Sequence, residues 1–207
     1  MTTVPLPAPG AGPAPDAVLP ARTPGYGTAR WGMVSLILTE AMIFGGLLGS
    51  YFFLRAAAKQ WPPPGVELPE LPQTIVFSIV LWASSAPVVW AEHAVRHDRL
   101  RAVRVALALS FVMGAAFMFH TLDDFGKLHF GWRDHAYGSI YYTTVGLHAI
   151  HVVIGLLMSA VIQVKAWTGR LTSERHKALE VFGLYWHFVD AVWVFVFLSL
   201  VLSPHIR

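Results

Sequence analysis

The stretch that decides the fold is VFGLYWHFVDAVWVFVFLSLVLS, residues 181–203, which is dominated by apolar residues and carries His187 and Asp190. A bilayer core of about 30 Å requires about 20 residues of α-helix, so this segment is long enough to cross it. A carboxylate at the centre of such a helix costs about 2.5–3.5 kcal/mol on insertion scales. We therefore expect Asp190 to face protein, water or a partner rather than lipid.

Four further stretches of the same kind precede it. The chain has 207 residues, of which 55% are hydrophobic and 13% charged, whereas soluble domains carry about 25% charged residues. The charges cluster and leave long neutral segments between them. The expected fold class is an all-α membrane protein, a bundle of five transmembrane helices. We predict these helices near residues 30–56, 73–95, 102–122, 137–166 and 177–203.

The basic residues predict the orientation. With five spans, the N-terminus and the second and fourth loops share one side of the membrane. That side would hold Arg22, Arg30, Arg96, Arg99, Arg101, Arg104, Lys165, Arg170, Arg175 and Lys177. The other side would hold Arg55, Lys59, Lys127, Arg133 and Arg207. The positive-inside rule then places the N-terminus in the cytoplasm and the C-terminus on the outer side. We interpret the net charge of +3 as a topology signal and expect no nucleic-acid partner.

Composition also divides the chain into two parts. Residues 1–28 are rich in Pro, Ala and Gly, a composition typical of a disordered segment. Residues 29–207 form the predicted five-helix transmembrane domain. The chain contains no cysteine, which excludes thiolate copper sites, cysteine-ligated iron–sulfur clusters and thioether-linked haem in this chain.

Several ionisable groups lie inside the predicted spans. Glu40 lies ten residues into the first span, near mid-membrane at about 1.5 Å per residue. His148 and His151 share a face of the fourth span, and His187 and Asp190 repeat that spacing on the fifth. Glu40 is either a helix-tying carboxylate or a group in proton relay or lipid contact. For the other four, bonds across helices are favoured over haem or metal ligation, and we expect one connected polar seam with Glu40.

Other polar residues lie at the predicted helix ends. His120 and Asp123 end the third span and are expected near the outer interface. His176 and Glu180 open the fifth span on the cytoplasmic side, where an acid suits the helix dipole. The remaining histidines are expected to be solvated in or near loops: His93, His97, His129, His135 and His205.

From about Trp31 to its end, the chain resembles subunit III of the haem-copper terminal oxidases. The first span, Met33 to Arg55, has an apolar run, a Tyr/Phe-rich end and Glu40 in place of the family's membrane carboxylate. Its Trp61-Pro62-Pro63 loop is similar to that of bacterial members. The remaining matches are Ala136 to Ser139 (AYGS), Gly146 to Val152 (GLHAIHV), His176 with Glu180, and Tyr185 to Trp193 (YWHFVDAVW).

This resemblance implies a core subunit of a proton-pumping respiratory oxidase that reduces oxygen to water. The chain would be a multi-pass protein of the inner (plasma) membrane of a bacterium. The chain would have no catalytic residue, metal or cofactor of its own, and haem and copper would belong to partner subunits. It would pack on catalytic subunit I beside subunit II, bind phospholipid and support proton uptake. Glu40 would support proton uptake; His148, His151, His187, Asp190, Glu180 and His176 would serve the polar seam or lipid contact.

Two differences from the family accompany the resemblance. The longest members have seven spans, and the first two are missing here. The family's Gln-x-x-Glu string is replaced by His120-Thr121-Leu122-Asp123. The electron donor to the complex would be cytochrome c, or quinol if the partner complex is a quinol oxidase. A nitric-oxide-reductase accessory protein is a further alternative, and a membrane haem-b electron carrier using His148, His151 and His187 is a remote one.

Overall fold

A computed structural model describes residues 27–66 and 68–206. Within these residues the chain forms helices and no strands, and five helical segments are long and apolar enough to cross a membrane. They are α1 (Thr28–Ala57), α2 (Leu71–Ala83) with α3 (Ser85–Arg96), α4 (Leu100–Lys127), α5 (Ala136–Trp167), and α6 (Lys177–Val196) with the π-helical turn η1 (Phe197–Leu202). The predicted five-span fold class is confirmed. The predicted disorder of residues 1–28 falls almost wholly outside the described residues.

The second span is two helices rather than the single helix predicted over residues 73–95. It breaks at Ser84, between α2 and α3, three residues before Pro87. Proline has no amide hydrogen, and its ring collides with the carbonyl oxygen of the residue four positions earlier. Pro87 therefore cannot continue a regular α-helix from Ala83, and the break exposes backbone and serine hydroxyls to neighbouring helices.

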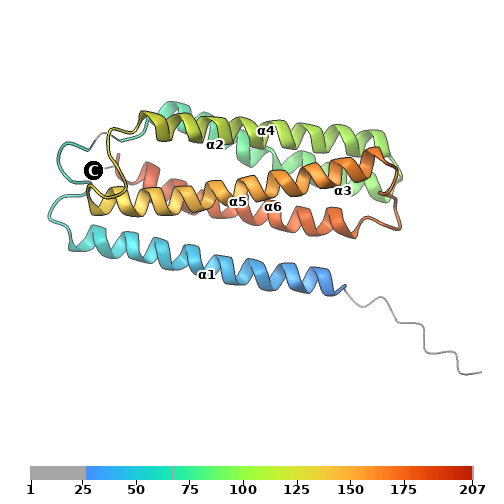
Figure 1. Ribbon diagram of the computed structural model, residues 1–207, viewed down its shortest axis with the longest axis horizontal. Helices are drawn as coiled ribbons and strands as arrows, with labels where there is room; N and C mark the ends of the chain where they lie inside the picture. Colours follow the sequence, from blue (N-terminus) through green and yellow to red (C-terminus); the bar gives the residue numbers. More distant parts are fainter. Residues whose placement is uncertain (1–26, 67, 207) are drawn as a thin grey trace, which may run out of the picture.

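The spans run side by side in three rows (Figure 1), with α4 beside α2 and α3, α5 beside α6, and α1 along one side. One end of the bundle carries the start of α1, the α3–α4 turn and the α5–α6 loop; we call it the N-terminal end. The opposite end carries the α1–α2 loop, the α4–α5 loop and the chain terminus, and we call it the C-terminal end.

α6 occupies the centre of the bundle. Its aromatic side chains are buried and reach α2 and the α2–α3 break through hydrogen bonds. The Trp186 indole nitrogen donates to Oγ of Ser84 at 2.8 Å, and that of Trp193 donates to Oγ of Ser78 at 2.9 Å. Since lipid offers no hydrogen-bonding partner, these two serines fix the rotation of α6 about its axis.

The Trp186 ring lies against two glycines, Gly114 on α4 and Gly155 on α5. A Cβ atom at either position would lie 2.7 Å from a carbon of the ring. The absence of a side chain at these glycines therefore lets α4 and α5 approach α6 closely, as small residues commonly do between transmembrane helices.

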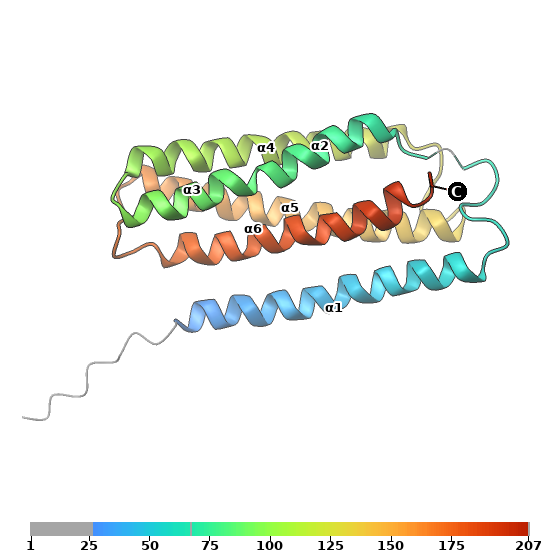
Figure 2. The same ribbon diagram turned by 180° about the vertical axis from the view of Figure 1, so that it is seen from behind.

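α1 is the least embedded span. Only Phe44 and Tyr51 are buried among its residues, and Figure 2 shows it running along the side of the bundle next to α6. At the C-terminal end it is held by Ser203, whose hydroxyl group lies 2.9 Å from the Tyr51 hydroxyl and accepts from Arg55 at 2.5 Å. α1 is thus attached firmly at one end and by few buried side chains elsewhere.

We expect Gly155→Ala to lower the free energy of unfolding by about 1–3 kcal/mol, because the new methyl group must displace Trp186 from a packed site. Gly146→Ala on the same helix is the matched control, since a Cβ there meets nothing within 4 Å. Denaturant titration of the purified protein in mixed micelles measures both. Equal stability of the two variants would contradict the packing described.

Candidate functional site: polar groups between the spans

The membrane carboxylate of α1 is bonded to α5. Oε2 of Glu40 lies 3.1 Å from Nε2 of His151, and both side chains are mostly buried. The other ring nitrogen of His151, Nδ1, lies 2.8 Å from the carbonyl oxygen of Leu147. Glu40 therefore faces the bundle rather than bulk lipid.

These contacts determine how many protons the pair holds. A carbonyl oxygen only accepts, so Nδ1 of His151 carries a hydrogen and donates it to Leu147. The contact between Nε2 and Glu40 then needs one more proton, on either the carboxyl group or the imidazole. In both cases the pair is electrically neutral overall, which suits a low-dielectric surrounding, and it holds one proton that the two groups share.

A second cluster ties α6 to the start of α3. The hydroxyl group of Ser85 donates to Oδ2 of Asp190 in a short hydrogen bond, and Oγ of Ser85 lies 2.8 Å from Nδ1 of His187. A serine hydroxyl has one hydrogen, so it accepts from Nδ1–H of His187 while it donates to Asp190. Ser85 thus links His187 to Asp190, while the other carboxylate oxygen of Asp190, Oδ1, is buried without a partner among the described residues.

The predicted single polar seam is divided in the structure. Glu40 with His151 forms one cluster, and His187 with Asp190 and Ser85 forms another. His148 joins neither by a hydrogen bond, since both of its ring nitrogens are buried without a partner in the described part of the chain. Its ring stacks on Trp193 with centroids 4.7 Å apart, so His148 packs as an aromatic core residue.

A charged cluster lies at the N-terminal end of the bundle, between α3 and α6. Oε1 of Glu180 lies 3.2 Å from Nε2 of His176 and 3.3 Å from the guanidinium group of Arg96. Glu92 reaches toward the same place from α3, and its carboxylate occupies the space where a side chain on Gly183 would lie. His176 and Glu180, which the sequence placed at the start of the fifth span, are therefore part of a larger cluster.

The predicted end of the third span, near residue 122, is wrong. α4 continues to Lys127, so His120 and Asp123 lie within the helix rather than at its end. Nε2 of His120 lies 3.2 Å from Oδ2 of Asp124, while Asp123 pairs with Lys127. Asp124 is the better placed acid because it also accepts a hydrogen bond from Thr74 on α2 at 3.3 Å.

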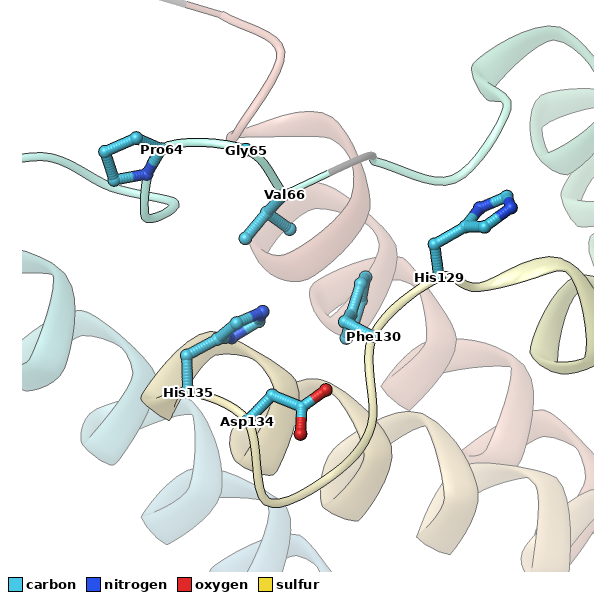
Figure 3. A pocket seen from close by; sticks show the side chains of 7 residues that line it. All are labelled: Pro64, Gly65, Val66, His129, Phe130, Asp134 and His135. Carbon is cyan, nitrogen blue, oxygen red and sulfur yellow. The ribbon is translucent and has the colours of Figure 1, made fainter.

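A small polar hollow opens at the C-terminal end, between the α1–α2 and α4–α5 loops (Figure 3). Its volume is about 210 Å³, and its lining includes His129, Asp134 and His135. Nδ1 of His135 accepts from the Gly138 amide at 2.8 Å, so in the neutral ring Nε2 carries the hydrogen and has no lone pair for a metal. Asp134 accepts from the Gly131 amide at 2.6 Å. These bonds order the start of α5 rather than prepare ligands.

The haem-b alternative requires His148, His151 and His187 as free ligands. His148 lies between aromatic rings, both nitrogens of His151 have partners, and Nδ1 of His187 is bonded to Ser85. Among residues 27–66 and 68–206, no group of three or more His, Asp or Glu side chains is placed to hold a metal ion. This geometry does not favour the carrier.

The sequence did not identify the residues that form hydrogen bonds or ion pairs with the buried polar groups. Ser78, Ser84 and Ser85 accept or donate the bonds of α6, and Asp124 and Glu92 enter clusters at opposite ends of the bundle. A signal existed for the serines, since the string Ser84-Ser85-Ala86-Pro87 puts a helix breaker beside two hydroxyl groups inside an apolar span. No comparable signal identified Glu92.

We expect Ser85→Ala to lower the free energy of unfolding by about 1–3 kcal/mol, because it leaves Asp190 and His187 without their shared partner. Ser110→Ala is the matched control, since the Ser110 hydroxyl is buried without a hydrogen-bond partner among the described residues and its removal costs little. Unfolding in mixed micelles compares the two. A loss as large for Ser110→Ala as for Ser85→Ala would show that Ser85 acts only by filling space.

Comparison with known proteins identifies the family. Residues 24–203 match the family model described as cytochrome c oxidase subunit III. The chain is 31% identical over 167 residues to cytochrome c oxidase subunit 3 of Thermostichus vulcanus, covering 80% of this chain and 83% of that one. It is 32% identical to the same subunit of Arabidopsis thaliana over 178 residues, covering 83% and 67% of the two chains. The chain therefore belongs to the cytochrome c oxidase subunit III family and forms part of a terminal oxidase complex.

Proposed function

We propose that this chain packs against catalytic subunit I, beside subunit II, of a proton-pumping cytochrome c oxidase and preserves its proton uptake without carrying a redox centre. The observation that carries this proposal is the pairing of its intramembrane polar groups. Glu40 with His151, and Ser85 with His187 and Asp190, bond across helices instead of converging on one point. Such an arrangement holds a scaffold together. Haem and copper then belong to the partner subunits.

Orientation and location follow from the charges. The N-terminal end of the bundle contains the α3–α4 turn and the α5–α6 loop, which carry most of the basic residues near helix ends. We place this end in the cytoplasm by the positive-inside rule, with the C-terminus on the outer side of a bacterial plasma membrane.

Glu40 is the proposed contribution to proton uptake. The Glu40–His151 pair is neutral and shares one proton between two nearly buried groups. We propose that the bond keeps α1 in place and that the shared proton of the pair supports the proton-entry region of the neighbouring subunit during turnover.

A phospholipid is the proposed ligand of a groove between α1, α5 and α6. The groove has a volume of about 540 Å³, and eight of its nine lining residues are apolar. The exception is Lys177, at the N-terminal end where headgroups would lie. An apolar groove with one cation at its end suits a phospholipid. Its acyl chain would lie along the apolar residues, and its headgroup phosphate would contact Lys177.

Cytochrome c is the proposed electron donor to the whole complex, through the partner subunits. The relatives reported above are named as cytochrome c oxidase subunits, and that naming favours this donor over quinol and over a nitric-oxide-reductase accessory role.

We expect the purified chain to show no haem absorption and, after chelator washing, to retain no copper. The physical reason is the absence of cysteine and the engagement of His148, His151 and His187 in packing and hydrogen bonds. A pyridine haemochrome assay and elemental analysis measure both quantities. One haem per chain would overturn the scaffold proposal in favour of an electron carrier.

We expect Glu40→Gln to assemble normally and to begin turnover at the wild-type rate, yet to lose activity faster during sustained oxygen consumption. The Gln amide can still donate to Nε2 of His151, but it carries no transferable proton. Oxygen-electrode traces of the purified oxidase give the initial rate and the lifetime. Glu174→Gln, which neutralises an exposed acid at the N-terminal end, is the control. A wild-type lifetime for Glu40→Gln would reduce Glu40 to a structural tie.

We expect Lys177→Ala to lower the amount of anionic phospholipid that copurifies with the oxidase, since the phosphate loses its cation. Lys165→Ala removes a cation at the same end but outside the groove lining. Lipid extraction with phosphorus-normalised mass spectrometry compares the variants. An equal loss in both would assign the effect to general surface charge.

A further inference from the structure

Two histidines lie four residues apart on the last turn of α3, at the N-terminal end of the bundle. His93 is in the helix and His97 is its C-cap, and both side chains are exposed. Their ring centroids are 4.5 Å apart, and the ring planes are inclined at 41°. Residues at this spacing share one face of a helix, so both imidazoles point to the same side.

A backbone bond fixes the protonation of one ring. Nδ1 of His97 lies 2.9 Å from the carbonyl oxygen of His93, so Nδ1 carries the hydrogen and donates it. In the neutral ring, Nε2 then keeps its lone pair. Histidines that bind metal ions usually donate their other N–H to a carbonyl or carboxylate in this way, which holds the ring in position.

His93 supplies the second donor. In the described part of the chain its ring makes a contact with the His97 ring and no hydrogen bond, so either nitrogen can present a lone pair. Metal–nitrogen bonds are about 2.0–2.1 Å long. Two imidazoles at this separation can reach one ion between them after a small rotation of the exposed His93 side chain.

The charged residues next to the two histidines are bonded to other groups and leave the imidazoles accessible. Arg96 lies between the two histidines in sequence, but its guanidinium group is directed to Glu180 at 3.3 Å. The Asp98 carboxylate is taken by Ser173, whose amide and hydroxyl donate to it at 3.1 and 3.0 Å. The two imidazoles are thus the available donors, and water would complete the coordination.

We propose that His93 and His97 form a two-imidazole surface site for a first-row divalent cation, with Zn²⁺ as its biological occupant. Imidazole suits zinc, copper and nickel, whereas Mg²⁺ and Ca²⁺ prefer oxygen ligands. The site is separate from any redox centre of the complex. Because the ion bridges the last helical turn to the cap residue, binding also stabilises the end of α3.

The test uses the purified intact oxidase, freed of loosely bound metal by a chelator. Zn²⁺ is titrated against a chromophoric indicator, with Mg²⁺ as the negative probe. His93→Ala and His97→Ala are each expected to weaken one Zn²⁺ site at least tenfold relative to wild type. Thermal midpoints measured without zinc establish that each variant is folded.

His205→Ala is the matched control. His205 makes the same bond as His97, from Nδ1 to a carbonyl oxygen four residues earlier at 2.8 Å, but that earlier residue is Val201 and offers no second imidazole. Its removal should leave the Zn²⁺ titration unchanged. Retention of full affinity in both α3 variants, an equal loss in His205→Ala, or equal binding of Mg²⁺ would each overturn the proposal.

Discussion

Hydrocarbon supplies no hydrogen bond, and this one constraint organises the bundle around α6. The helix carries two tryptophans, a histidine and an aspartate that all need partners. The partners are serines from α2, the break at Ser84 and the start of α3. Because each bond has a fixed direction, together they set the rotation and depth of α6, and the close approach of α4 and α5 to Trp186 follows from that placement.

α1 differs from the other spans in a way that matters for function. Among the described residues, it is bonded to another helix at mid-membrane through Glu40 and His151, while Ser203 holds its C-terminal end. Toward its N-terminal end, a groove with Lys177 separates it from α5 and α6. The proposed roles in lipid binding and proton uptake therefore fall on the same loosely packed side of the molecule.

The sequence predicts the five spans well because bilayer thickness dictates the length of every apolar stretch. It predicts poorly which polar groups meet. From His120, both Asp123 and Asp124 lie within helical reach, and only the position of Thr74 on α2 selects Asp124. Likewise, Glu40 pairs with His151 rather than His148 because the two histidines point to different neighbours, Glu40 and Trp193. Such choices depend on how helices rotate against one another, which apolar periodicity leaves undetermined when every face is hydrophobic.

The most direct test of this account is a double-mutant cycle on Ser84→Ala and Trp186→Phe, measured by unfolding in mixed micelles. The account predicts a coupling free energy of about 0.5–1.7 kcal/mol, the range found for hydrogen bonds between transmembrane helices, because each single variant removes the same bond. Strictly additive losses would show that the two residues act independently. In that case polar pairing with the α2–α3 break would not be what positions α6.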